Sequence, residues 1–479
     1  MERTKTYKMK APTIERGLLS GVDLRLRLIR SLFWVHLLGA CVFAGGKSGL
    51  EPAPRQTEAK GKDNQIVSKS IPSIIDGINI DAMEVSPNYT GPNLKDGKVD
   101  IRFLAELLDT YKNEWKGGKG YSAKYEQKYL HSKYAYQILR QARNFFQSQP
   151  ALIDVNLPAG ENLTIVGDTH GSLRTMLTIF GLNGFPSEET TYLFNGDFID
   201  FGSESTECVL TLLTLKILFP EGLFINRGSH ESRTRAPNER VNYDSLESEC
   251  PKKYPLKMLD AIWEVFDWLP VAHVVNKEVL VLHGGLFSDS NITLDDIRKI
   301  RRPSDDKRDR LLLDEIVWSD PMRNNGIAAI GNGQAGIYFG PDVTKDFCQR
   351  NKLRYIVKSH ARHEDGYNAE HDGLLITVHS STSDDITSRE GGGGRKIKSA
   401  LLRLQSPQLF PNISLFEKNQ DLDSTLKLIT LFRKSLENNA TTLSPLERLA
   451  EILKNRIKRR LGFVGDWLFG LGNTPLPLP

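Results

Sequence analysis

In the stretch "FINRGSHESR", residues 224–233, a short apolar run is followed by a polar cluster that contains Gly, Ser and His. Two further stretches have the same form: "VGDTHG" at residues 166–171 and "NGDFIDFG" at residues 195–202. Helical patterns at "SLRTMLTIFGLNG" and "TECVLTLLTLKILF" separate the three apolar runs. This alternation predicts a parallel sheet, whose ligand sites lie at the carboxyl ends of the strands. We therefore expect the three polar clusters at one edge of a sheet.

A second group of strands is expected further along the chain. The apolar runs are "VLVLHGGL" at residues 279–286, "YIVKSH" at residues 355–360 and "LLITVHSS" at residues 374–381. Two of them place a histidine, His283 and His360, where the strand ends. These side chains can join the polar clusters of the first group.

Aspartate and histidine at successive strand ends are suited to metal-assisted hydrolysis of a phosphate ester. Two ions about 3.5–4 Å apart, held by oxygen and imidazole ligands, can turn a bound water into a nucleophile. A protonatable side chain must also face the leaving oxygen, and His230 is the candidate, with Asp200 on its second ring nitrogen. The candidate ligands are Asp168, His170, Asp197, His283 and His360.

These motifs resemble the phosphoprotein phosphatase family of metal-dependent Ser/Thr phosphatases. "GDTHG", "NGDFID", "RGSHE", "LHGGLFSD", "WSDP", "IVKSH" and "EDGY" occur in the family's order, and "YTGPNLKDGKV" at residues 89–99 is similar to the protein phosphatase five branch. The resemblance implies an α/β metallophosphoesterase fold with a central β-sandwich flanked by helices. It also implies hydrolysis of phosphoserine or phosphothreonine, with phosphoproteins as substrates.

The resemblance further implies two divalent metal ions, manganese or iron with zinc, and assigns their ligands by position. The first ion would be held by Asp168, His170 and Asp197. The second would be held by Asp197 as a bridge, the Ser229 position, His283 and His360. The general-acid pair would be His230 and Asp200.

Four positions depart from the family pattern at the site. Phe201 replaces a phosphate-gripping arginine, and Ser229 replaces an asparagine ligand. Gly333 stands near the expected place of a second arginine, and Asp384 near that of a tyrosine. Because charge-assisted bonds to phosphate contribute about 1.5–3 kcal/mol each, losing two arginines is expected to slow turnover.

A basic segment directly after His230 offers a replacement for the missing arginines. It contains Arg233 and Arg235, which we predict as substrate-binding residues, although a solvated basic loop is the simpler explanation for them. Three functions stay open: an active metallophosphatase, a pseudophosphatase that binds partners without turnover, and a phosphoesterase of altered substrate range.

The domain organisation follows from shifts in composition. Residues 1–46 have a basic start and then the apolar run "SLFWVHLLGACVFAGG", which predicts a signal or membrane anchor and so a membrane-anchored or secretory location, with the cytoplasm as the alternative. Residues 47–87 are a polar linker, residues 88–407 the catalytic domain, and residues 408–479 a helical tail with a helix expected at 444–461.

The composition of the 479 residues is that of a globular protein, with 39% hydrophobic and 25% charged residues. The net charge of +4 is too small to indicate a nucleic-acid partner, and none is expected. The four cysteines form no CxxC pair, so neither a zinc knuckle nor a disulfide scaffold is predicted.

Overall fold

The computed structural model of the chain describes residues 72–115, 129–187, 189–233, 244–331, 333–381, 398–417, 420 and 422–437. All of them belong to one compact unit that begins at Ser70. The apolar run at 31–46, the tail helix expected at 444–461, Arg235 and Asp384 lie outside the described residues. Within the described ranges, no helix is both long enough and apolar enough to cross a membrane.

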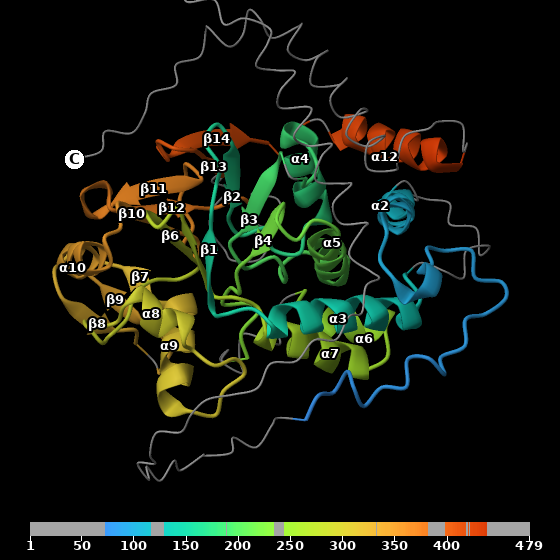
Figure 1. Cartoon of the computed structure of the whole chain (residues 1–479), viewed down its shortest axis with the longest axis horizontal. Coiled ribbons are helices and arrows are strands. Elements are labelled where there is room, and N and C mark those ends of the chain that lie inside the picture. The colour runs from blue at the N-terminus through green and yellow to red at the C-terminus, as the bar shows by residue number, and fades with distance from the viewer. Residues whose placement is uncertain are drawn as a thin grey trace, which may run out of the picture. The chain divides into compact units, whose positions relative to one another are not determined.

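The first sheet contains the strands that precede the three polar clusters (Figure 1). Its order is β14-β13-β2-β3-β4, and β2, β3 and β4 run parallel, as the alternation of strands and helices predicts. β13 pairs antiparallel with both β2 and β14. The strands are β2 (Asn162–Val166), β3 (Thr191–Phe194), β4 (Leu223–Ile225), β13 (Ser399–Gln405) and β14 (Asn412–Phe416).

The second sheet has the order β1-β5-β6-β10-β12-β11. β10 lies parallel to both β6 and β12, so the three apolar runs of the second group are neighbours. The strands are β1 (Leu152–Val155), β5 (Ala272–Val275), β6 (Val279–Leu282), β10 (Tyr355–Lys358), β11 (Tyr367–Glu370) and β12 (Leu375–Val378). A small third sheet joins β7 (Asp320–Pro321), β9 (Ile337–Phe339) and β8 (Ile327–Ala329).

The two large sheets enclose one apolar core between them. Side chains of β2 and β13, such as Ile165 and Leu402, form a single buried cluster with side chains of β6 and β10, such as Val281 and Val357. Every residue of β3, β6, β10 and β12 is buried, because each strand has a sheet on one face and further packing on the other. The expected α/β fold with a central β-sandwich flanked by helices is confirmed.

Helices cover the outer face of the first sheet. The core there joins Phe194 and Ile225 of the strands to helices such as α5, which is buried on nearly every side. Figure 1 shows α12 beside α2, a contact between segments more than 300 residues apart in the sequence. The helices are α2 (Ile101–Trp115), α3 (Ser132–Gln147), α4 (Leu173–Asn183), α5 (Ser205–Leu218), α6 (Leu246–Lys253), α7 (Lys257–Asp267) and α12 (Leu422–Glu437).

Three helices pack with the second sheet and the small sheet. Their core joins Ile297 and Ile316 to strand residues such as Leu282 and Ile356. The helices are α8 (Leu294–Arg298), α9 (Lys307–Trp318) and α10 (Pro341–Asn351), and two 3₁₀ turns, η1 (Lys95–Gly97) and η2 (His371–Gly373), complete the described elements.

The packed structure continues past the domain boundaries expected at residues 88 and 407. Ile75 and Ile80 are buried ahead of the first boundary, and Leu426 and Ile429 of α12 are buried beyond the second. The boundaries themselves stay a prediction. The helical character expected of the tail is present in α12, whereas β14 adds a strand within the same region.

Candidate metal centre

The loops after five strands bring the predicted ligands together. Asp168 follows β2, Asp197 follows β3 and Ser229 follows β4, all in the first sheet. His283 follows β6 and His360 follows β10, both in the second sheet. Asp168 also forms a bridge with His379 at the end of β12, which joins the two sheets at this edge. The site therefore lies where the carboxyl ends of both sets of strands meet.

Asp197 is the side chain that these residues share. One group of potential ligands consists of Asp197, His170 and His230, and another of Asp197, His283 and His360. Within each group the ligand atoms lie within 4.8 Å of one another. A buried carboxylate common to two adjacent donor sets is what a bridging ligand of a two-metal site requires.

Hydrogen bonds fix the orientation of His283. Its Nδ1 is 2.7 Å from the carbonyl oxygen of Asn195, which calls for an N–H at that nitrogen. The Nε2 atom is left facing Asp197 Oδ2 at 3.1 Å. A histidine whose outer nitrogen donates to a backbone carbonyl, with the inner one aimed at a carboxylate, is arranged as a metal ligand.

His360 also presents one nitrogen to the site. Its Nδ1 is 3.3 Å from Ser229 Oγ, and its Nε2 is 3.7 Å from Asp320 Oδ2. Asp320 in turn accepts a hydrogen bond from the buried Lys358. Burial would raise the pKa of Asp320, but the charges of Lys358 and His360 and the hydrogen bond from Lys358 together outweigh it and lower that pKa. Asp320 and Lys358 thus anchor His360 from outside the site.

Unsatisfied buried atoms show that the donor set fits a metal ion. Asp168 Oδ2, His170 Nδ1 and His283 Nε2 are buried and make no hydrogen bond of good geometry. Desolvated polar atoms without partners cost about 1–3 kcal/mol each, and a cation at this position would satisfy several of them together. Carboxylate oxygens and imidazole nitrogens are the ligands of zinc, iron and manganese.

Protonation at the site is dominated by burial and by the two aspartates. Burial would lower the pKa of His283, but Asp197 and Asp168 outweigh it and raise that pKa to about 9. Burial would raise the pKa of Asp197, but the charge of His283 lowers it. Burial dominates at His170 and lowers its pKa to about 4. Since a ligand histidine must be neutral, metal binding displaces the proton from His283.

His230 and Asp200 form the expected pair. His230 Nδ1 is 2.8 Å from Asp200 Oδ2, and His230 Nε2 lies 3.9 Å from Asp197 Oδ2. Asp200 is held by the backbone N–H of Leu246, which donates to its Oδ1 at 2.7 Å. His230 therefore faces the metal-ligand cluster with one nitrogen while a fixed carboxylate orients the other.

The backbone at the site is strained. The φ values are +45° at His170, +50° at Asp197, +67° at Asp200, +62° at Phe201 and +71° at His360. Non-glycine residues in the left-handed region cost free energy and persist where the surroundings enforce them. The loops approach so closely that a Cβ on Gly196 would lie 2.5 Å from the Cα of Gly228.

Two residues that hold the site were not identified from the sequence. Glu231 is buried and accepts hydrogen bonds from the backbone N–H groups of Asp197, Phe198 and Gly228. His379 is buried with its Nδ1 3.4 Å from Asp168 Oδ2. Glu231 could have been identified from its position in the motif "RGSHE". His379 could have been identified from its position at the end of the apolar run "LLITVH".

Ser229 occupies the expected ligand position. It is buried, and its Oγ lies 3.0 Å from Asp197 Oδ2 and 3.3 Å from His360 Nδ1. A hydroxyl between these two residues can contribute an oxygen to the second group of ligands. It is a weaker ligand than the amide oxygen that the family resemblance places there.

The two positions that lack the expected arginines differ in their surroundings. The ring of Phe201 contacts His170 edge-on at a centroid distance of 4.8 Å, and its centroid is 5.2 Å from that of His230. Gly333 is exposed with φ of +70°, and a Cβ there would meet nothing within 4 Å. Phe201 is therefore part of the site, whereas Gly333 lies in an exposed turn.

The side chain of Arg233 makes its contacts with residues outside the ligand cluster. Its side chain pairs with Asp267 at 2.9 Å, and its guanidinium lies 5.5 Å from the centre of the Trp263 ring. This ion pair would have to break for Arg233 to reach a phosphate. Since Arg235 lies outside the described residues, the substrate-binding role of both arginines stays a prediction.

Comparisons with known proteins agree with the fold and the site. Residues 162–361 match the family model of calcineurin-like phosphoesterases. Residues 63–154 match the model described as the PPP5 TPR repeat region. Over 344 residues the chain is 40% identical to serine/threonine-protein phosphatase 5 of Homo sapiens, an alignment that covers 72% of this chain and 64% of the human protein.

Two further relatives support the same grouping. The chain is 40% identical over 333 residues to serine/threonine-protein phosphatase 5 of Arabidopsis thaliana, covering 70% of this chain and 57% of that protein. A solved Saccharomyces cerevisiae serine/threonine phosphatase, described as similar to human phosphatase PP5, matches with a TM-score of 0.55 at 31% identity. That match covers 65% of this chain and 95% of the yeast chain.

Proposed function

Because this chain belongs to the phosphoprotein phosphatase family, with relatives in its phosphatase 5 branch, we propose that it hydrolyses phosphoserine and phosphothreonine in proteins. The activity is a proposal because the chain spans 64% of the length of its human relative. The observation that carries it is the arrangement around Asp197, which two adjacent sets of ligands share while the His230–Asp200 pair faces it.

The family is one of metal-dependent enzymes, and we infer two divalent ions, manganese or iron with zinc. When bound, the ions supply an activated water and neutralise charge on the phosphoryl group. The residues that would hold them are Asp168, His170, Asp197, Ser229, His283 and His360.

The chain's own residues account for the remaining steps. His230, protonated at Nε2, donates a proton to the oxygen of the departing serine or threonine. Asp200 keeps its bond to Nδ1 and so holds the ring in position throughout. Glu231 fixes the loop that carries Asp197 through backbone N–H groups, so the ligand cluster is organised before substrate binds.

One observation favours the second candidate function, a pseudophosphatase that binds partners without turnover. Phe201 presents an uncharged ring to His170 and His230 at the position of the family's phosphate-gripping arginine. The third candidate function, a phosphoesterase of altered substrate range, is supported by the same replacement of arginine by Phe201. The match of residues 63–154 to a repeat region supports contacts with protein partners.

The location is a separate proposal. The basic residues and apolar run within residues 1–46 support entry into the secretory pathway or a membrane anchor. Fractionation of cells that express the full chain and a chain lacking residues 1–46 would test this. Recovery of both chains in the same soluble fraction would argue for the cytoplasm.

The direct test of the activity is release of phosphate from a phosphothreonine peptide with added Mn²⁺. We expect turnover that depends on Mn²⁺ and falls at least about 10³-fold in Asp197→Asn, because the shared ligand is lost. Asp154→Asn, which changes an exposed carboxylate of β1, serves as the control and should match the wild type. Equal rates in Asp197→Asn and wild type, with both folded, would contradict the proposal.

A further inference from the structure

Arg362 stands beside the site on the loop that follows β10. It lies two residues after His360 and is half-buried. Its guanidinium carbon is 5.3 Å from the centre of the Phe201 ring, within the range of a cation–π contact. The guanidinium is thus held against the residue that replaces the expected arginine.

Phe201 links Arg362 to the reacting groups. The same ring contacts His170 edge-on at 4.8 Å and lies 5.2 Å from the His230 ring. Ligand atoms of His170 and His230 lie within 4.8 Å of Asp197 and of each other. A positive charge held against the Phe201 ring is therefore next to the place where a phosphoryl group must sit, between the metal ligands His170 and Asp197 and the His230–Asp200 pair.

We propose that Arg362 binds the phosphoryl oxygens of the substrate and supplies, from the loop after β10, the cation missing at position 201. This inference rests on the proposed function, because it assigns a residue to the same site. A guanidinium offers N–H donors in a planar fork that matches two phosphate oxygens, and the contact with the Phe201 ring keeps that group beside the site.

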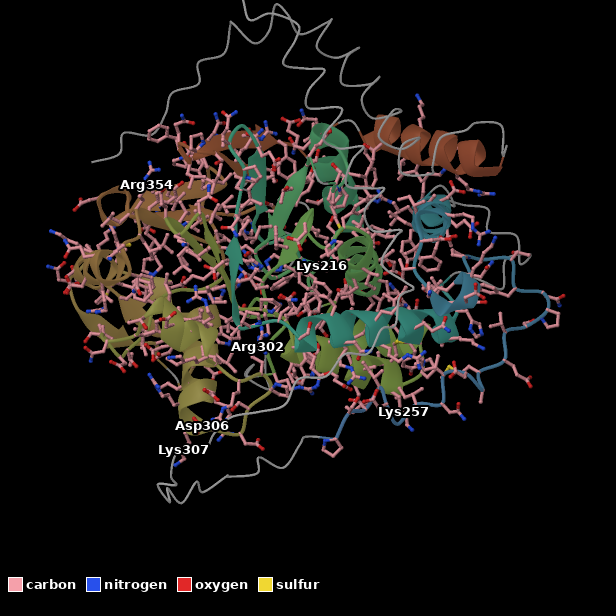
Figure 2. The ribbon with its side chains drawn as sticks, in the orientation of Figure 1. Lys216, Lys257, Arg302, Asp306, Lys307 and Arg354 are labelled. Atoms are coloured by element: carbon pink, nitrogen blue, oxygen red, sulfur yellow. The ribbon has the colours of Figure 1, made fainter. Side chains whose placement is uncertain are left out.

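The structure offers a matched control at the opposite end of β10. Arg354 directly precedes the strand, and its guanidinium carbon is also 5.3 Å from an aromatic ring, that of Phe410. Arg354 is labelled in Figure 2, where it lies beside the strands of the second sheet. It pairs with Glu278 and contacts no predicted ligand. Arg354→Met therefore removes the same kind of contact away from the site.

The test measures binding of inorganic phosphate to the Mn²⁺-loaded full chain by calorimetry, together with the metal content. Arg362→Met removes the charge and keeps a flexible side chain over Phe201, and we expect phosphate binding at least about tenfold weaker than in the wild type. Arg362→Lys should lose less, and Arg354→Met should bind phosphate as the wild type does. Adding Phe201→Arg to Arg362→Met should restore binding, because it returns a guanidinium to position 201.

Wild-type affinity for phosphate in Arg362→Met, with unchanged metal content, would overturn the inference. An equal loss of phosphate affinity in Arg354→Met would also overturn it, because the loss would then not be specific to the site. Phosphate binding does not require turnover. If the wild type binds phosphate through Arg362 but releases none from a phosphothreonine peptide, the proposed activity fails while the assignment of Arg362 stands.

Discussion

Ser229 lies at a position where its side chain is proposed to be a ligand of the second ion. Its hydroxyl lies between Asp197 and His360, with no other side chain of the "RGSHE" loop directed to both. We predict that Ser229→Asn, which provides an amide oxygen, binds the second Mn²⁺ on the order of tenfold more tightly, an effect of about 1.4 kcal/mol. Ser229→Ala should bind it more weakly than the wild type. Identical Mn²⁺ affinities in the three folded proteins would remove Ser229 from the ligand set.

His230 is predicted to act as the general acid, and the choice of leaving group tests this role. We expect His230→Ala to lower kcat for a phosphothreonine peptide by about 10²–10⁴-fold, since an alkoxide needs a proton to depart. The loss should be much smaller for p-nitrophenyl phosphate, whose phenolate departs without one. Losses of the same size for both substrates, at unchanged metal content, would indicate that His230 acts through the metal ligands instead.

Helix α5 carries a buried cation that links stability to pH. Lys216 lies inside the molecule, where its Nζ contacts the rings of Phe145 and Phe224 and donates to the carbonyl oxygen of Pro220 (Figure 2). Burial lowers the pKa of Lys216 to about 7. In the unfolded chain Lys216 keeps its proton up to about pH 10.4. Between about pH 7 and pH 10 the unfolded state therefore binds more protons than the folded state, so the free energy of unfolding rises with pH.

We therefore predict that the free energy of unfolding of the wild type rises between pH 7 and pH 9 by about 2 kcal/mol more than that of Lys216→Met. Urea unfolding at the two pH values measures this difference. Lys257→Met, which changes an exposed lysine of α7, is the control and should keep the pH dependence of the wild type. The same pH dependence in all three proteins would show that Lys216 stays charged when buried.

The N-terminus of α5 also holds the site. Glu249 of α6 accepts hydrogen bonds from the backbone N–H groups of Ser205 and Thr206, each at 2.8 Å, where an N-cap side chain would normally act. Ser205 Oγ in turn accepts from the backbone N–H of Asp200. The position of the His230–Asp200 pair therefore depends on the contact between two helices.

For the molecule as a whole, the residues of the proposed metal centre come from both sheets of the sandwich. Asp168, Asp197 and Ser229 come from the first sheet, whereas His283 and His360 come from the second. An ion held by both sets would add a further tie between halves of the fold that already meet through the apolar core and through the Asp168–His379 bridge. Binding of a ligand to the folded state alone stabilises it, so metal loading should raise the melting temperature of the whole unit.

The sequence predicted those parts of the site that follow from strand ends. Asp168 and Asp197 each follow an apolar run, so their convergence followed from parallel strands alone, whereas the approach of His283 also depends on the packing of the second sheet against the first. The contribution of His379 did not follow from the strands, because it depends on the bridge to Asp168 across more than 200 residues. The contact of Arg362 with Phe201 and the packing of α12 on α2 also join distant segments, for which local sequence patterns carry no signal.

The central claim is that this metal centre turns over phosphoprotein substrate. The measurement that tests it most directly is a Mn²⁺ titration of the metal-free wild type that follows bound metal and phosphate release from a phosphothreonine peptide in the same samples. We predict that phosphate release appears as the second equivalent of Mn²⁺ binds. A folded chain that binds two equivalents and releases no phosphate would contradict the claim and leave the pseudophosphatase and the phosphoesterase of altered substrate range as the remaining functions.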